Sequence, residues 1–174
     1  MVSLEMEAGA AQEADGLITE VPGIALGIST ADCIPVFFWD PEYHAAGIAH
    51  TGWRGLKSGM ITEMISWFRD YFRSQKKSLQ VAFGPAIRRC CYEVGEEFRD
   101  FFPGFYFEVD SPSKAKRGRM DLLAAARDQA LAQGILAEHI FDAGICTSCQ
   151  NDRFFSARRE GTSERIFSVI QILG

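Results

Sequence analysis

Two short apolar runs separated by a turn constrain the fold of this chain more than any other feature. Residues 33–39 are rich in aromatic and branched side chains, residues 45–49 form a second apolar run, and an Asp-Pro step between them favours a turn. The pattern predicts an antiparallel pair of strands, in which the start of the first lies beside the end of the second. We therefore expect Cys33 and His50, which occupy these two positions, to be spatial neighbours.

The string TGWRG follows the second strand directly. Its two glycines, Gly52 and Gly55, bracket Arg54 at the point where a strand period changes into a helix period. A turn of this kind presents backbone N–H groups and the positive end of a helix, which suits an anion.

Cys33 and His50 support two chemical interpretations. Cysteine and histidine are zinc ligands, and a catalytic zinc has three protein ligands and an open fourth position. Alternatively, His50 lowers the pKa of Cys33 and makes it a nucleophile. The plain alternative is that Cys33 is a small buried apolar residue. Asp32, which precedes it, acts as an acid or base, orients His50, or caps the turn.

Composition indicates one globular domain over residues 1–174, since 47% of the side chains are apolar and 24% are charged. The net charge of −5 argues against nucleic acid or an anionic membrane as a partner. No apolar run reaches the roughly 18 residues of a membrane span, and the first residues lack the pattern of a signal peptide. We expect a cytoplasmic protein, and the odd number of cysteines suits a reducing compartment.

The four cysteines other than Cys33 are expected to be structural. Cys90 and Cys91 are adjacent, and neighbouring residues on a strand point to opposite faces, so both cannot easily bind one ion. The string CTSC, which holds Cys146 and Cys149, resembles half of a zinc knuckle. A four-ligand site needs a second pair with the usual gap, which the adjacent pair lacks, so the spacing argues against such a site.

Hydrophobic periodicity predicts the remaining elements. An apolar stripe predicts a helix over residues 56–72, and Asp121 and Gly134 bound a second helix as its N-cap and its C-terminal stop. Residues 103–119 are expected to form a mobile surface loop, and residues 165–173, apolar on nearly both faces, a central strand covered on both sides. Further elements are expected as strands over residues 2–6, 17–21, 24–28, 79–83 and 140–144 and a short helix over 96–102. This order suits an α/β layered domain with a mixed sheet.

Four strings, TADCIPVFFWD, AHTGWRGLKSGM, FGPAIRRCCYEVGEEF and CTSCQNDRFFSARREGTSERIFSVIQI, resemble the bacterial laccase-domain family, once called multicopper polyphenol oxidases. The similarity covers about residues 14–173. It implies an α+β layered sandwich with a mixed sheet, a fold shared with toxin deamidases that use a Cys and His pair. It also implies a purine nucleoside phosphorylase that deaminates adenosine and cleaves methylthioadenosine, with zinc held by two histidines and one cysteine.

By these motifs, Cys33 and His50 correspond to two of the three zinc ligands. The family's other histidine belongs to a Gln-Val-His-Gly motif upstream of the segment matched by residues 14–19, and the sequence begins too late to contain it. His44 and His139 do not occupy that position. The resemblance therefore implies a domain that is short at its N-terminus and supplies two ligands.

The resulting hypothesis is a zinc-dependent purine nucleoside phosphorylase with adenosine deaminase activity. The phosphate is expected on Arg54, on the N–H groups of the turn from Gly52 to Gly55, and on Arg158. Alternation predicts that only one of Arg158 and Arg159 faces the site. In deamination, zinc lowers the pKa of the attacking water.

Three alternatives stay open. The first is a hydrolase that uses Cys33 and His50 without metal. The second is a copper phenol oxidase, which three histidines in the sequence make the weaker interpretation. The third is an inactive remnant, or a fragment completed by a partner chain. The expected partners are purine nucleosides and phosphate.

Overall fold

A six-stranded mixed sheet forms the centre of the molecule. The computed structural model describes residues 2–3, 14–109 and 117–174, and structural statements refer to these residues. The strands lie in the order β1-β2-β5-β4-β6-β10. Their bounds are β1 Val2–Ser3, β2 Gly16–Thr19, β5 Ala45–Thr51, β4 Ile34–Asp40, β6 Gln80–Phe83 and β10 Ile140–Asp142. The predicted α/β layered fold with a mixed sheet is confirmed. The first strand was expected over residues 2–6, of which residues 4–6 lie outside the described part of the chain.

Strands β4 and β5 form the predicted antiparallel pair. Their register runs from Ile34 opposite Thr51, through Pro35 opposite His50, to the pairing of Asp40 with Ala45. Most side chains of the pair are buried. The hairpin therefore brings the start of β4 to the end of β5, as the sequence indicated.

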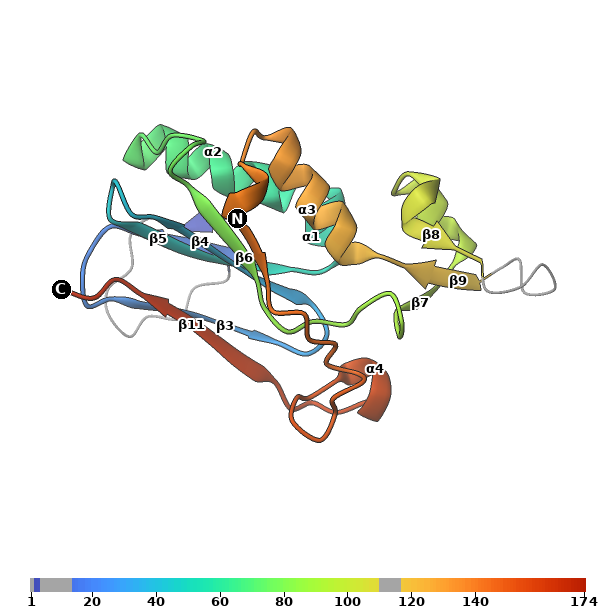
Figure 1. Ribbon diagram of the computed structural model, residues 1–174. Helices are drawn as coiled ribbons and strands as arrows, with labels where there is room; N and C mark the ends of the chain where they lie inside the picture. Colours follow the sequence, from blue (N-terminus) through green and yellow to red (C-terminus); the bar gives the residue numbers. More distant parts are fainter. Residues whose placement is uncertain (1, 4–13, 110–116) are drawn as a thin grey trace.

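Helices cover one face of this sheet (Figure 1). They are α1 Trp53–Lys57, α2 Met60–Phe72 and α3 Leu122–Ala132. The single helix predicted over residues 56–72 is wrong in its first part, because Gly59 adopts φ +86°, a left-handed conformation that separates α1 from α2. Asp121 is the N-cap of α3, since its side chain accepts a hydrogen bond from the N–H of Ala124 at 2.9 Å.

A two-stranded sheet lies on the opposite face (Figure 1). It pairs β3 (Ala25–Thr30) with β11 (Ile166–Gln171) and encloses a second apolar cluster against the main sheet. The prediction of a central final strand is wrong: within the described residues β11 pairs with β3 alone, and Phe167 is 70% exposed. The ring of Phe167 packs on Gly27, where a Cβ would stand 2.5 Å from it, and among the described residues Phe167 and Val169 of β11 are exposed.

A small third sheet lies beside the ends of the main one. It consists of β7 Glu93–Gly95, β9 Arg117–Met120 and β8 Phe107–Glu108, in that order. The short 3₁₀ helices η1 Glu96–Asp100 and η2 Gly104–Tyr106 lie between β7 and β8 in the sequence. A further 3₁₀ helix, η4 Ala137–His139, precedes β10. The predicted loop over residues 103–119 is wrong in its described part, because Phe107 and Met120 pair and are buried. Residues 110–116 lie outside the described residues. No helix in the described part of the chain is long and apolar enough to cross a bilayer.

Candidate functional site

Asp32, directly before β4, ties together three segments that are distant in sequence. Its carboxylate accepts hydrogen bonds from the hydroxyl of Thr147 and from the backbone N–H of Arg158, each at 2.7 Å. Its carbonyl accepts the N–H of Ile87 at 2.9 Å. The side chain is buried and the backbone has φ +84°, a strained value for a residue other than glycine. Asp32 thus caps the first turn of α4 (Ala157–Glu160), and it makes no hydrogen bond to His50.

Cys33 and His50 lie at the adjoining ends of β4 and β5. The backbone of Gly52 passes so close to the thiol that a Cβ there would stand 3.0 Å from Cys33 Sγ. Nδ1 of His50 lies 3.3 Å from Oδ1 of Asp15, and the N–H of His50 donates to the Asp15 carbonyl at 2.7 Å. Since Asp15 holds Nδ1, the other ring nitrogen, Nε2, remains available to a ligand.

The environment of Cys33 disfavours a free thiolate. Burial raises the pKa of Cys33 above its ordinary value of 9.0, and the carboxylate of Asp32 raises it further. Arg165 lowers this pKa, and Asp15 raises it. The thiol is therefore protonated at neutral pH unless a cation arrives to stabilise its anion.

Tyr92 is a half-buried phenol beside Arg158. Burial raises the pKa of its phenol to about 12; the charge of Arg158 opposes the shift, Cys33 and Asp32 add to it, and Arg54 opposes it. The guanidinium of Arg158 lies 5.2 Å from the centre of the Tyr92 ring. The phenol of Tyr92 is therefore neutral at physiological pH and can donate a hydrogen bond.

The two adjacent arginines of α4 have different surroundings. Arg158 donates from its guanidinium to the carbonyl of Glu93, and so reaches towards Tyr92. The side chain of Arg159 is exposed, while its N–H donates to the hydroxyl of Ser156, the N-cap of α4. Arg54 is exposed at the start of α1 and stacks on Trp53 at 4.5 Å.

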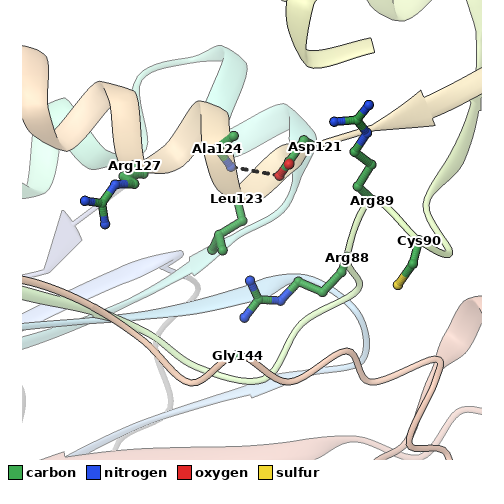
Figure 2. A pocket seen from close by; sticks show the side chains of 8 residues that line it. All are labelled: Arg88, Arg89, Cys90, Asp121, Leu123, Ala124, Arg127 and Gly144. Atoms are coloured by element: carbon green, nitrogen blue, oxygen red, sulfur yellow. Dashed lines mark hydrogen bonds between the residues drawn. The ribbon is translucent and has the colours of Figure 1, made fainter. Parts of the chain in front are cut away.

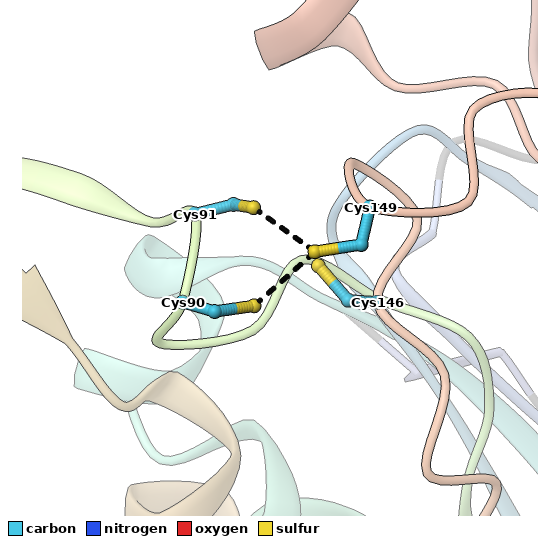
Figure 3. A group of neighbouring side chains, drawn as sticks. All are labelled: Cys90, Cys91, Cys146 and Cys149. Carbon is cyan, nitrogen blue, oxygen red and sulfur yellow. Dashed lines mark hydrogen bonds between the residues drawn. The ribbon is translucent and has the colours of Figure 1, made fainter.

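The four remaining cysteines assemble in space (Figure 3). Their sulfur atoms all lie within 4.8 Å of one another; they belong to Cys90, Cys91, Cys146 and Cys149. The expectation that the adjacent pair cannot share an ion is wrong. These two residues lie in a turn, in which the N–H groups of Cys91 and Tyr92 both donate to the Arg88 carbonyl, so strand alternation does not apply.

A hollow of about 400 Å³ lies next to this cysteine group (Figure 2). Three arginines line it, Arg88, Arg89 and Arg127, but Figure 2 shows their guanidinium groups pointing in different directions. Arg88 is bound through two nitrogens to the carboxylate of Asp142. The hollow therefore lacks the convergent donors of an anion site.

Sequence reasoning missed Asp15, which holds the ring of His50, and Tyr92, whose ring packs against Arg158. No local pattern marks them, because each reaches the site through a long-range contact. For the cysteines, a signal was present: two pairs in one chain, of which one has the spacing of a metal-binding turn.

The family model described as "Multi-copper polyphenol oxidoreductase laccase" matches residues 1–173. The chain belongs to this family. The resemblance inferred from the four motifs is thereby confirmed.

Curated members of this laccase family are named as purine enzymes. The chain is 36% identical over 161 residues to a protein named purine nucleoside phosphorylase YlmD from Geobacillus stearothermophilus, covering 90% of this chain and 59% of that protein. It is 32% identical over 179 residues to one named adenosine deaminase RL5, from an unknown prokaryotic organism, covering 97% and 66%. The chain thus spans about three fifths of the length of the first relative.

Solved structures of laccase-family proteins have the same fold. The crystal structure of Geobacillus stearothermophilus YlmD matches with a TM-score of 0.84 at 34% identity, covering 92% of this chain and 61% of that one. The Bacillus licheniformis protein YfiH matches with a TM-score of 0.85 at 33% identity, covering 91% and 61%.

Proposed function

We propose that this chain carries the larger part of the active site of a zinc-dependent purine nucleoside phosphorylase that also deaminates adenosine. Adenosine, inosine and methylthioadenosine are the proposed substrates for phosphorolysis. The observation that carries the proposal is the position of Cys33 and His50 at adjoining strand ends, with the Asp15 carboxylate beside the His50 ring. The names of the relatives, purine nucleoside phosphorylase and adenosine deaminase, support it.

Cys33 and His50 are suitable zinc ligands, but they are two of the three that the site needs. A thiol and an imidazole are a zinc donor set, and a carboxylate on the far nitrogen of a ligating histidine fixes its tautomer and orientation. The third ligand implied by the resemblance is a histidine upstream of residues 14–19. His44 lies in the turn at the opposite end of the hairpin, and His139 lies in η4. A bound zinc would supply a Lewis acid and lower the pKa of water at this position.

The proposed phosphate site uses the turn from Gly52 to Gly55. The first hydrogen bond of α1 runs from Leu56 N to Gly52 O, so the N–H groups before it have no partner within the helix. Arg54 adds an exposed guanidinium there, and Arg158 adds a second charge beside Tyr92. In phosphorolysis, phosphate forms a bond to C1′ while the bond from C1′ to the purine breaks, and the base leaves with the electron pair. These groups would hold the attacking anion in place.

Asp32 is proposed as a positioning residue rather than as an acid or base. Both of its carboxylate oxygens already accept hydrogen bonds from protein groups. Its role would be to hold Thr147 and α4 against the start of β4, where Cys33 begins the metal site.

The test is an assay of the purified chain with inosine or adenosine and phosphate, in the presence of zinc. We expect release of the free base together with ribose 1-phosphate, and loss of this activity in Cys33→Ala and His50→Ala. His44→Asn is the matched control: it removes a histidine of the same hairpin, and asparagine tolerates the positive φ found there. Full activity in both site variants would overturn the proposal. So would activity only towards phenols with added copper, the chemistry in the family's description.

A zinc-independent hydrolase is the other outcome that the assay separates. Such an enzyme would lose activity on thiol alkylation even after treatment with a chelator. The raised pKa of Cys33 speaks against it, because a nucleophilic cysteine needs a thiolate near neutral pH.

A further inference from the structure

We propose that Cys90, Cys91, Cys146 and Cys149 form a second metal site, a structural Zn²⁺ site with four thiolate ligands. It would join the turn after β6 to the loop that precedes α4 (Figure 3). The inference is independent of the purine chemistry proposed for Cys33 and His50.

The spacing of the sulfur atoms fits one ion shared by four ligands. A tetrahedron with Zn–S bonds of about 2.3 Å has edges of about 3.8 Å. Cys149 Sγ lies 3.5 Å from Cys90 Sγ and 3.4 Å from Cys91 Sγ, and all four sulfurs lie within 4.8 Å of one another. A disulfide would require one pair at about 2.05 Å. Here one sulfur is nearly equidistant from two others, which is the pattern of a shared ligand site.

Backbone hydrogen bonds define both segments that carry the cysteines. The N–H of Gln150 donates to the Cys146 carbonyl at 3.1 Å, and the N–H of Cys91 donates to the Arg88 carbonyl at 2.9 Å. Cys146 is buried, whereas Cys90 and Cys149 are exposed. One ligand is therefore fixed by packing in the protein interior, and the exposed thiols let an ion enter from solvent.

One arginine lies directly beside the cluster. Four thiolates on one divalent ion carry a net charge of about −2, which favours cationic surroundings. The guanidinium of Arg119 donates to the Cys90 carbonyl at 3.0 Å, whereas Arg88 and Arg89 are paired with Asp142 and Glu108.

The position of the cluster shows what an ion there would stabilise. The cysteine turn lies between Ile87 and Tyr92, and the loop that starts at Cys146 carries Thr147. Ile87 and Thr147 are two of the three residues that hold Asp32, and the ring of Tyr92 packs against Arg158. A four-thiolate site has no open position, so its role is structural, and it would brace the wall beside Cys33.

The experiment measures zinc per chain by mass spectrometry in the purified protein and in single variants. We expect Cys149→Ser and Cys90→Ser each to lose about one equivalent of zinc relative to the parent. Cys33→Ser is the matched control: it removes the thiol of the other proposed zinc site, so the zinc that it keeps belongs to the cluster and should amount to about one equivalent. Cobalt added to the metal-free parent should give the thiolate-to-metal charge-transfer bands of a tetrahedral sulfur site, and these bands should be absent in Cys149→Ser.

A cysteine variant that fails to fold gives no information on metal binding, so a second measurement uses proteins in which the cluster is intact. Chelation should lower the Tm of the parent and of Cys33→Ser, and added zinc should restore it in both. Three results would overturn the proposal: a parent without metal and with four free thiols, a disulfide within the cluster in protein purified without oxidant, or unchanged zinc content in Cys149→Ser.

Discussion

The backbone N–H of Arg158 donates a hydrogen bond of 2.7 Å to the buried carboxylate of Asp32, although the two residues lie 126 positions apart in the sequence. Thr147 donates to the other carboxylate oxygen. The contact fixes α4, and with it the Arg158 side chain, beside the strand end that bears Cys33. Asp32 thus positions the backbone of this arginine, while the Glu93 carbonyl and the Tyr92 ring hold its guanidinium.

Asp32→Asn should destabilise the protein. Asparagine tolerates the positive φ of this position, but its amide nitrogen cannot accept a hydrogen bond, so one of the two donors loses its partner. We expect a loss of about 1–3 kcal/mol in the free energy of unfolding, measured by urea denaturation. The pH profile of kcat/KM should keep its shape. Unchanged stability with a lost limb of that profile would instead assign Asp32 as an acid or base.

Asp15→Asn should weaken zinc binding at Cys33 and His50. The carboxylate of Asp15 orients the His50 ring through Nδ1, and loss of such a partner costs about 10–100-fold in metal affinity. Zinc titration against a competing chelator measures the change. Asp70→Asn, an exposed acid on α2 paired only with Arg69, is the control and should leave the affinity unchanged. Equal affinity in Asp15→Asn and the parent would contradict the role of Asp15.

The sequence predicted that the start of β4 lies beside the end of β5, because a short connection fixes the register of a hairpin. It also predicted the helix bounded by Asp121 and Gly134, since capping is a local property. Both are short-range inferences, and both agree with the structure.

The cysteine cluster and the final strand were beyond such reasoning, for two physical reasons. The cluster depends on a turn conformation at Cys90 and Cys91 and on a contact with a loop more than fifty residues away. The position of the final strand depends on which elements pack on its two faces, and an apolar sequence alone does not reveal them. In the structure Phe167 packs on Gly27 and is exposed.

The ion pair between Arg88 and Asp142 should make stability depend on pH in acid. The hydrogen bonds from Arg88 hold the pKa of Asp142 below its ordinary value of 3.8, and the N–H of Gly144 also lowers it, against the opposing effect of burial. A lowered folded-state pKa gives stability that is complete above the unfolded pKa and is lost as pH falls through the folded one. Asp142→Asn should cost about 1 kcal/mol at neutral pH, since the pair is partly exposed.

The check on this pair is urea denaturation of the parent and of Asp142→Asn at neutral pH and again in strong acid. The difference between the two proteins should vanish in acid, where Asp142 is protonated in the parent. Glu63→Gln, on α2 and without an ion pair among the described residues, should show no difference at either pH. A difference in the free energy of unfolding that persists in acid would show that the packing of the Asp142 side chain, not its charge, stabilises the protein.

Gly52→Ala should disturb the thiol of Cys33 without unfolding the chain. The backbone of Gly52 has φ −84°, which alanine adopts freely, but the added methyl would stand 3.0 Å from Cys33 Sγ. Because the thiol or the turn must shift, we expect overpacking to cost about 1–3 kcal/mol, divided between stability and metal binding. Gly104→Ala is the control, since nothing lies within 4 Å of a Cβ there. Zinc affinity and Tm of both variants provide the measurement. If Gly52→Ala equals Gly104→Ala in both zinc affinity and Tm, the close approach of Gly52 to Cys33 Sγ has no energetic consequence, and the prediction is contradicted.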